Sequence, residues 1–229
     1  MRFHVGPEGR DEYLRHPEGT PVIVDVLRAT STIVVALRRG AARVIPACDY
    51  DEALALGRRL GAVTIGERHG IKVDGFDYGN SPTDLLQVPL EGKTIVMVTT
   101  NGTRVMVEGG IIASTLNAGT AAALIAGRPH AYLLASGSPR KSDEDLCAAR
   151  FIEQVADDIC AGADPDAAAA SAFFSDRGQR LLEGIRASAS GKKLASYGSG
   201  EDVDLACTAI NRFPVLPIYR DGQIRLARL

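Results

Sequence analysis

Short runs of β-branched and other apolar residues alternate along the chain with longer segments in which apolar residues recur at helical spacing. Clusters of β-branched residues favour strands, whereas a period near 3.6 residues favours helices. The alternation predicts an α/β fold with a largely parallel, mixed sheet and helices on both faces. The predicted strands are 22–26, 43–47, 63–66, 94–98, 111–114, 131–135 and 215–219, and the clearest predicted helices are 32–39, 51–60, 119–126 and 143–161.

Residues typical of helix ends flank these segments. Asp49 and Ser142 precede two of the predicted helices and are expected to be N-caps, since short polar side chains accept hydrogen bonds from free backbone N–H groups. Gly40, Gly61 and Gly127 stand where helices are expected to end.

The last third of the chain departs from the alternation. Residues 164–191 are rich in Ala and carry no strand signal, so they predict one or two helices packed on the edge of the sheet, with Pro165 near a helix start. A short helix at 201–211 and a terminal hairpin around Asp221 and Gly222 follow. We therefore expect one α/β domain over residues 1–229, with a helical insertion at about 164–191.

Composition narrows the functional classes. The chain has 229 residues, 45% hydrophobic residues, a formal net charge of -2, 5% aromatic residues and no Trp. Nucleic-acid binding generally needs a basic face or stacking aromatics, so no nucleic-acid partner is expected. The apolar runs are too short to span a bilayer, which predicts no membrane association and a cytoplasmic location. The apolar run VLPIY, if it lies at a sheet edge, could pair across a homodimer.

The segment PVIVDVLRATST at 21–32 brings an acid and a base to the end of a predicted strand. Ligands of open α/β sheets bind at the carboxyl ends of strands, where the N-terminus of the next helix also points. Asp25 is a candidate metal ligand and Arg28 a candidate anion-binding group. The hydroxyl groups that follow, of Thr30, Ser31 and Thr32, are candidate substrate contacts.

A second strand end carries TTNGTR at 99–104. Small and hydroxylated residues with a glycine allow close approach of the backbone to an anion, and Arg104 adds a guanidinium fork. An ordinary strand-to-helix turn with a threonine cap would show the same pattern. The candidate substrate contacts here are Thr100, Asn101, Gly102 and Thr103.

The long loop GERHGIKVDGFDYGNSP at 66–82 follows a third strand, and long loops at strand ends are often binding loops. Glu67, Arg68 and Asn80 are its candidate substrate contacts. His69 is a candidate general acid, although a lone histidine in a loop is more often a solvated surface residue.

A fourth strand end is followed by Ser136 and Gly137, both candidate substrate contacts, and by the acidic start of a helix. Glu144 and Asp145 could join Asp25 in an oxygen-ligand Mg²⁺ site. Acids also favour helix N-termini for electrostatic reasons alone, and Asp202 and its acidic neighbours pose the same ambiguity.

Taken together, these strings resemble the 2-phosphosulfolactate phosphatase family associated with coenzyme M biosynthesis. The matching strings are DVLRATST, GERHGIKVDGFDYGNSP, TTNGTR, Leu116-Asn117-Ala118, DEDLCAA and, more weakly, GSGEDVDLAC, in family order from about Val24 to Leu216. The resemblance implies a three-layer α/β/α sandwich and Mg²⁺-dependent hydrolysis of a phosphate monoester to sulfolactate and phosphate. Position 69 is typically Gly in the family, which argues against an essential His69.

The resemblance also organises the candidate residues. A substrate that carries a phosphate, a carboxylate and a sulfonate needs several cations close together, and Arg28, Arg68 and Arg104 are available. Asp25 is expected to bind the metal, with Glu144 and Asp145. Attack by a metal-activated water is favoured over an aspartyl-phosphate, because the Asp-x-Asp motif of the haloacid-dehalogenase phosphatases is absent. A phosphatase of another small acidic phosphoester and a non-catalytic metabolite binder are the alternatives.

Overall fold

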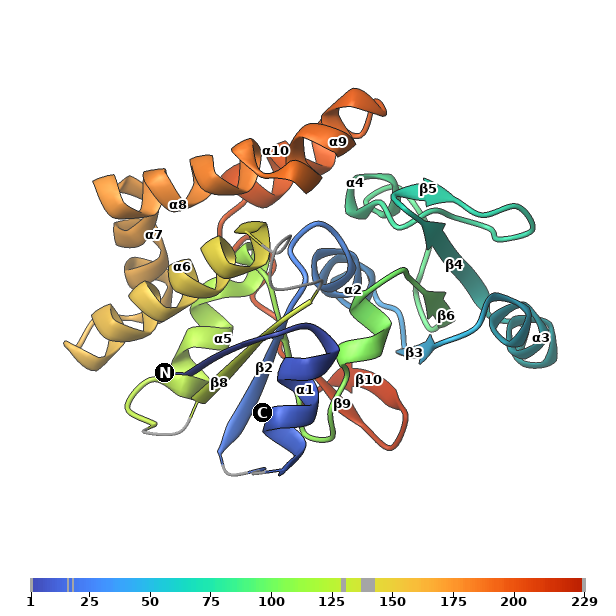
Figure 1. Cartoon of the computed structure of the whole chain (residues 1–229), viewed down its shortest axis with the longest axis horizontal. Helices are drawn as coiled ribbons and strands as arrows, with labels where there is room; N and C mark the ends of the chain where they lie inside the picture. The colour runs from blue at the N-terminus through green and yellow to red at the C-terminus, as the bar shows by residue number, and fades with distance from the viewer. Residues whose placement is uncertain (1, 16, 18, 129–130, 137–142, 228–229) are drawn as a thin grey trace.

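The computed structural model describes residues 2–15, 17, 19–128, 131–136 and 143–227. Its core is one ten-stranded mixed sheet with helices on both faces, which confirms the predicted α/β sandwich (Figure 1). The strands are β1 (Arg2–Val5), β2 (Thr20–Val24), β3 (Arg43–Ala47), β4 (Val63–Arg68), β5 (Ile71–Lys72), β6 (Thr94–Val98), β7 (Ile111–Ala113), β8 (Ala131–Ala135), β9 (Pro217–Arg220) and β10 (Gln223–Leu226). The α-helices are α1 (Gly6–Arg15), α2 (Ala29–Arg38), α3 (Tyr50–Leu60), α4 (Pro82–Leu85), α5 (Ala118–Ile125), α6 (Asp143–Cys160), α7 (Pro165–Phe174), α8 (Asp176–Ala187), α9 (Ala189–Ser196) and α10 (Gly200–Thr208), and η1 (Gly102–Val105) and η2 (Thr115–Asn117) are 3-10 helices.

The sheet consists of two parallel groups joined by the terminal hairpin. Its order is β1-β8-β2-β7-β9-β10-β3-β6-β4-β5. Asp221 and Gly222, which form the turn of the predicted hairpin, both have positive φ (50° and 73°), as a tight two-residue turn requires. The suggestion that VLPIY forms an edge strand available to a dimer partner is wrong, because β9 lies inside the sheet between β7 and β10.

The two parallel groups meet at their carboxyl ends although the hairpin separates them. The pairings β7–β9, β9–β10 and β10–β3 are all antiparallel, so β3, β6 and β4 are reversed relative to β2 and β8 along the ladder. Each step of a twisted sheet rotates the strand direction by roughly 20–25°, and the rotation accumulates over a sheet this wide. The chain segments that follow β2, β8, β4 and β6 all contribute residues to the lining of one cavity.

Alternation along the strands fills both faces of the sheet. In β2, Val22 and Val24 face the core under α5 and α6, whereas Ile23 faces the core under α2. In β6, Val96 and Val98 contact a smaller core that includes Ala53 of α3. Helices thus cover both faces, with α2 buried on one of them.

The predicted bounds of three strands, 43–47, 94–98 and 131–135, match β3, β6 and β8. Helix α2 begins three residues earlier than predicted, with Arg28 at its N-cap position. The side chain of Asp25, three residues before the cap, accepts a hydrogen bond from the amide of Ala29, the first residue of the helix. Asp49 caps α3 as predicted and Gly61 ends that helix with positive φ, whereas Ser142 lies outside the described residues. The pattern missed β1 and α1 at the N-terminus.

The Ala-rich segment forms three helices rather than one or two: α7, α8 and the first part of α9. It does not pack on the sheet edge. Ala168, Ala172 and Leu182 join the core that contains Phe151 of α6, so the segment forms an outer helical layer over α5 and α6 (Figure 1). This layer brings α9 to the carboxyl end of β8.

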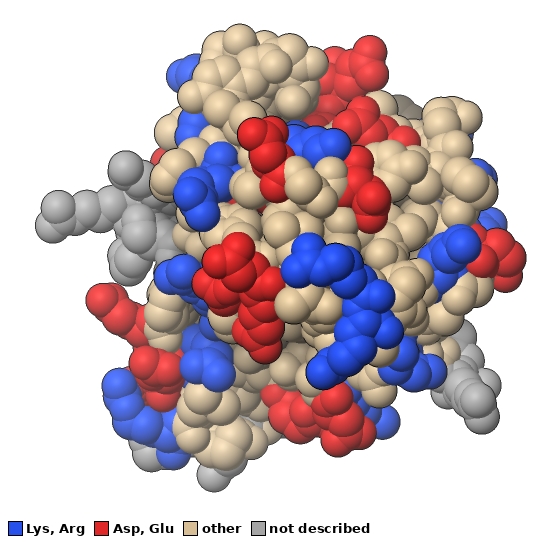
Figure 2. Space-filling model, turned by 90° about the vertical axis from the view of Figure 1, so that its right-hand side faces the viewer, with Lys and Arg blue, Asp and Glu red and all other residues tan. Residues whose placement is uncertain are grey.

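Around α3 the surface carries mixed charge. Figure 2 shows acidic and basic side chains interspersed on this face rather than gathered into a field of one sign. Recognition of a small anion is therefore expected to depend on the cavity rather than on this face. Among the described residues, no helix combines the length and apolar character needed to cross a bilayer.

Candidate active site

A cavity of about 480 Å³ lies where the carboxyl ends of β2, β4, β6 and β8 meet. Cavities of this size at the carboxyl edge of an α/β sheet are the usual place for a small-molecule site. Its described lining consists of Asp25, Leu27, Arg28, Glu67, His69, Gly70, Asn80, Thr99, Thr100, Asn101, Ser136, Glu144, Asp145, Ala189, Ser190, Lys193 and Leu194.

Asp25 follows the last residue of β2 and is 6% exposed. Its Oδ1 accepts from the amide of Ala29 at 3.1 Å, and its backbone N–H donates to Thr30 Oγ1 at 3.1 Å. These bonds fix the carboxylate at the N-terminus of α2, where the positive end of the helix dipole partly compensates its charge. The second oxygen, Oδ2, faces Ser136.

Ser136 lies between two buried carboxylates. Its Oγ is 2.6 Å from Asp25 Oδ2 and 3.1 Å from Asp145 Oδ2. A serine hydroxyl has one proton and can donate to only one of these oxygens at a time. Asp145 is held by the amide of Val26, which donates to its Oδ1 at 2.8 Å. The two carboxylates therefore converge on a point where an added proton or a cation would stabilise them.

The pKa values of the acids in this cluster are raised. Burial raises the pKa of Asp25 above its usual value, and the charge of Glu67 adds to the effect. Burial also raises the pKa of Asp145 well above the ordinary aspartate value, and the neighbouring charges of Asp25 and Glu144 raise it further. The pKa of Glu144 is raised first by burial and then by Asp25. Repulsion among these carboxyls disfavours their simultaneous ionisation.

The oxygen atoms at this point suit Mg²⁺ in part. No three His, Cys, Asp or Glu side chains within the described ranges stand close enough together to form a complete metal site. Mg²⁺, however, is commonly held by one or two carboxylates plus waters and substrate phosphate. Asp25 and Asp145 provide such a pair. Glu144 Oε2 is buried without a hydrogen-bond partner and could accept a hydrogen bond from a metal-associated water.

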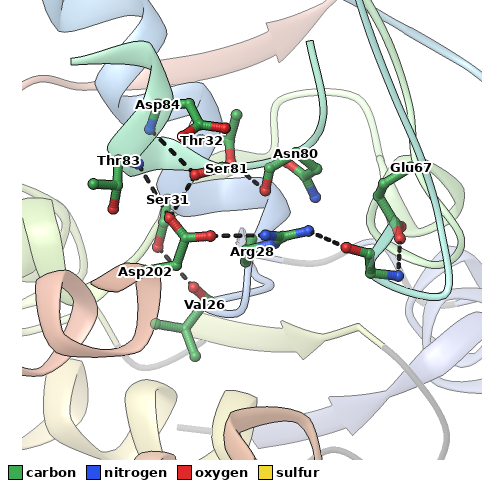
Figure 3. Close-up of polar contacts among 11 residues, drawn as sticks. Val26, Arg28, Ser31, Thr32, Glu67, Asn80, Ser81, Thr83, Asp84 and Asp202 are labelled. Carbon is green, nitrogen blue, oxygen red and sulfur yellow. Dashed lines mark hydrogen bonds and ion pairs between the residues drawn. The ribbon is translucent and has the colours of Figure 1, made fainter. Parts of the chain in front are cut away.

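Arg28 lines the cavity but is already paired. Its Nη1 donates to Asp202 Oδ2 at 2.7 Å, and its Nη2 donates to the carbonyl of Gly70 at 2.8 Å (Figure 3). Asp202 Oδ1 also accepts from Ser81 Oγ at 2.7 Å and from the amide of Thr83 at 3.2 Å. The buried carboxylate of Asp202, on α10, thus joins the first turn of α4 to Arg28. The sequence left open whether Asp202 binds a metal or only favours a helix N-terminus, and these contacts indicate that it positions Arg28 and α4.

Glu67 connects two loops of the cavity wall. Its Oε1 accepts from the amide of Thr100 at 2.7 Å, and its Oε2 accepts from the amide of Gly70 at 2.6 Å. The amide of His69 in turn donates to Thr100 Oγ1 at 3.0 Å. Both oxygens of Glu67 therefore position the loops, although the side chain also lines the cavity as predicted for a substrate contact.

The three hydroxyls predicted as substrate contacts after Arg28 do not line the cavity. Thr30, Ser31 and Thr32 are fully or almost fully buried inside α2. Thr30 Oγ1 donates to the carbonyl of Asp25 at 2.9 Å, and Ser31 Oγ donates to the carbonyl of Val26 at 2.8 Å. These two hydroxyls hold the turn that carries Asp25, because a hydroxyl on a helix that faces the core bonds to nearby backbone. Thr32 Oγ1 instead donates to the carbonyl of Asn80 at 3.4 Å.

Of the three arginines predicted to surround the substrate, the described cavity lining includes only Arg28. Arg68 is exposed and its guanidinium lies over the ring of Tyr50, 4.4 Å from the centroid. Arg104 is exposed on η1 and is likewise absent from the lining. Their positions do not support the prediction that the three arginines lie close together around the substrate.

Some of the remaining predicted substrate contacts line the cavity, and others do not. Asn80, Thr100, Asn101 and Ser136 line the cavity, and the Oδ1 of Asn80 is buried without a partner. Thr103 is not part of this lining, and its amide donates to Thr99 Oγ1 at 3.2 Å. Gly137 lies outside the described residues.

Two polar groups of the site were missed in the sequence. Ser190 and Lys193 of α9 line the cavity, and Ser190 Oγ donates to Glu144 Oε1 at 2.6 Å. Ser190 lies in the Ala-rich segment 164–191, whose pattern predicts only packed helices, and Lys193 lies two residues beyond its end. The spacing of Ser190 and Lys193 by three residues on a helix was the one available signal, and such spacing is too common to indicate a site.

Gly102 allows the close packing behind Asp25. A Cβ at this position would clash with Ala29 Cβ and would lie 2.6 Å from Asp25 Oδ2. Gly102→Ala is therefore expected to displace the carboxylate, lower activity, and destabilise the fold by roughly 1–3 kcal/mol, as overpacking generally does. Urea denaturation and phosphate release measure the two effects. Gly200→Ala is the control, since its Cβ would meet only Ala195 at 3.8 Å or beyond; equal effects of the two substitutions would contradict the assignment.

The fold and this cavity define a class: an α/β enzyme with a buried, carboxylate-rich active site at the carboxyl ends of its strands. A profile described as 2-phosphosulpholactate phosphatase matches residues 6–222, so the chain belongs to the 2-phosphosulfolactate phosphatase family and to the phosphoric monoester hydrolases. It is similar to a protein of Thermotoga petrophila named as a probable 2-phosphosulfolactate phosphatase, with 38% identity covering 89% of this chain and 90% of the relative. Proteins of the same name from Thermotoga maritima (36% identity, 89% and 90% covered) and Gloeobacter violaceus (35%, 88% and 89%) are also similar.

Proposed function

We propose that this chain hydrolyses the phosphate monoester of 2-phosphosulfolactate to 3-sulfolactate and phosphate, with Mg²⁺ as cofactor. The substrate is the one in the names of the family and of the relatives. The observation that carries the proposal is the convergence of Asp25 and Asp145 on Ser136 inside the cavity. Paired carboxylates beside a small polar cavity suit phosphoryl transfer, which depends mostly on positioning and charge neutralisation.

Asp25 and Asp145 would hold the metal through the oxygens that face Ser136. When bound, Mg²⁺ would neutralise charge on the phosphoryl oxygens and make a water molecule a better nucleophile. Ser136 would orient the two carboxylates, because its hydroxyl lies within hydrogen-bonding distance of both. Glu144 would stand behind them, anchored by Ser190.

Water is the favoured nucleophile rather than Asp25 itself. One Asp25 oxygen accepts from the amide of Ala29, and the other, which faces Ser136, is the oxygen proposed to hold the metal, so neither is left to attack phosphorus. In the proposed step, the water oxygen bonds to phosphorus, the ester P–O bond breaks, and the alcohol oxygen of sulfolactate takes up the proton from the water.

Arg28 and Asn80 would orient the substrate. Arg28 retains N–H groups beyond the two that Asp202 and Gly70 accept, because a guanidinium has five donors. The side-chain amide of Asn80 has an unpaired oxygen, and rotation of the amide would present its NH₂ group to an anion. Both side chains are buried, so their contacts with substrate would form with little competing water.

Phosphate release from 2-phosphosulfolactate tests the proposal. We expect turnover with Mg²⁺, loss of turnover by at least about 100-fold in EDTA, and recovery when Mg²⁺ is returned, since a catalytic metal contributes several kcal/mol. Turnover that EDTA leaves unchanged would contradict the metal. Equal or faster turnover of 2-phospholactate, which lacks the sulfonate, would favour another small phosphoester, and binding without turnover would favour a metabolite binder.

A further inference from the structure

The described lining of the cavity has more acidic than basic side chains, and one of the basic side chains, Lys193, has no acidic partner among the described residues. Its described lining contains the carboxyl groups of Asp25, Glu67, Glu144 and Asp145 but only two lysine or arginine side chains. One of these is Arg28, whose charge is balanced by Asp202 at 2.7 Å. The other is Lys193, which forms no ion pair with any described residue, so its charge remains available to a ligand.

Lys193 is placed by the outer helical layer. Helix α9 begins after Ser188. The hydroxyl of Ser188 accepts a hydrogen bond from the amide of Gly191 and so caps the helix. Ser190 and Lys193 lie on one face of this helix, and both line the cavity. Ser190 is bonded to Glu144 at the acidic end, whereas Lys193 lies about 4.5 Å farther along the helix axis, given the rise of 1.5 Å per residue.

The surroundings of Lys193 indicate the mouth of the cavity rather than its floor. The side chain is exposed, and its Nζ lies 5.6 Å from the centroid of the Tyr197 ring, which is itself half exposed. Asp25 and Asp145, in contrast, are 6% and 2% exposed. A ligand that reached from these carboxylates to Lys193 would therefore extend from a buried end to an open one.

We propose that Lys193 binds the sulfonate of the substrate at the mouth of the cavity and so makes the site selective for sulfonated phosphoesters. The inference rests on the proposed function, in which the phosphoryl group lies at Asp25 and Asp145. The sulfonate is attached to the carbon beside the phosphorylated one and stays ionised at neutral pH. Its three equivalent oxygens suit an ammonium group, which acts as a point charge with rotatable donors and needs no planar partner.

Lys193→Gln tests this assignment, with Lys192→Gln as the matched control. Lys192 is the exposed neighbour on the same helix and is not part of the lining. For Lys193→Gln we expect KM for 2-phosphosulfolactate to rise about tenfold while kcat stays within about threefold, as loss of one charge-assisted contact in the ground state predicts. KM for 2-phospholactate should change less than about twofold, and Lys193→Arg should restore most of the loss.

Calorimetric binding of 3-sulfolactate and of lactate separates this inference from the proposed reaction. If 3-sulfolactate binds the parent chain about tenfold more tightly than it binds Lys193→Gln, the sulfonate site is supported even when no turnover is found, and only the proposed reaction fails. Normal turnover with equal behaviour of the Lys193 and Lys192 variants would overturn the sulfonate site alone. Equal losses for both substrates, or no binding of 3-sulfolactate to the parent chain, would also overturn it.

Discussion

Asp25→Asn is expected to reduce Mg²⁺-dependent phosphate release by at least about 100-fold, because it removes one of two carboxylates proposed to hold the metal. The shape of the side chain is retained. An asparagine can still accept from the amide of Ala29 through its oxygen and can donate to Ser136 Oγ through its NH₂ group, since these two contacts lie on different atoms of the carboxylate. Loss of activity would then reflect the charge rather than a disturbed turn.

The same substitution is expected to stabilise the metal-free protein at neutral pH. The pKa of Asp25 is raised in the folded state, chiefly by burial, and that of Asp145 is raised well above its ordinary value. A carboxyl whose pKa is raised by folding costs nothing below its unfolded pKa, where both states are protonated. It lowers the free energy of unfolding as the pH rises above that value, because the unfolded chain ionises first.

Thermal melting in EDTA checks this sign. Tm of Asp25→Asn should exceed that of the parent chain at pH 7, and the difference should shrink as the pH falls below the ordinary aspartate pKa of 3.8, where the parent carboxyl becomes protonated in both states. Mg²⁺ should raise Tm of the parent more than that of the variant, because a ligand stabilises the state that binds it. Asp143→Asn is the control, since Asp143 is an exposed acid in the first turn of the same helix as Asp145. An Asp25→Asn protein that hydrolysed substrate normally would refute the metal role of Asp25.

The part of the site that the sequence predicted well depends on short segments of chain. Asp25 and Ser136 directly follow β2 and β8, and Asp145 lies in the first turn of the helix after β8. The carboxyl ends of β2 and β8 are neighbours because the two strands pair in parallel. Local pattern and sheet topology together place such residues. The turn hydroxyls Thr30 and Ser31 show the limit of this reasoning, because the pattern cannot tell whether a hydroxyl faces the cavity or the core.

What the sequence did not predict depends on contacts between distant segments. Asp202 meets Arg28 across 174 positions of the chain, and Ser190 meets Glu144 across 46. Arg68 was predicted to face the substrate, but the aromatic face of Tyr50, on another element, offers it a cation–π partner outside the cavity. Such pairings follow from how the helical layer and the loops pack, and no local periodicity records them.

Asp202→Ala is expected to produce the largest loss of stability among these variants, about 3–5 kcal/mol, because it leaves a buried charge without its partner. The Arg28 and Asp202 side chains are only 5% and 2% exposed, so water cannot readily replace the lost carboxylate. The substitution also removes the acceptor of Ser81 Oγ and of the Thr83 amide, which frees the first turn of α4. Urea denaturation measures the loss, and activity should fall as well, since Arg28 lines the cavity.

Asp204→Ala is the matched control because it lies on the same helix, α10, and belongs to an ion pair with Arg186. That pair is long, 3.8 Å, and its side chains are 34% and 72% exposed. Exposed pairs of this kind contribute below about 1 kcal/mol, since water and salt screen them. A loss for Asp202→Ala no greater than that for Asp204→Ala would show that Arg28 finds another acceptor. The double variant Arg28→Met/Asp202→Leu removes both charges, and replacing both members of a buried pair by apolar residues is often nearly neutral. If this variant is about as stable as the parent chain, the instability of Asp202→Ala arises from the unpaired charge of Arg28.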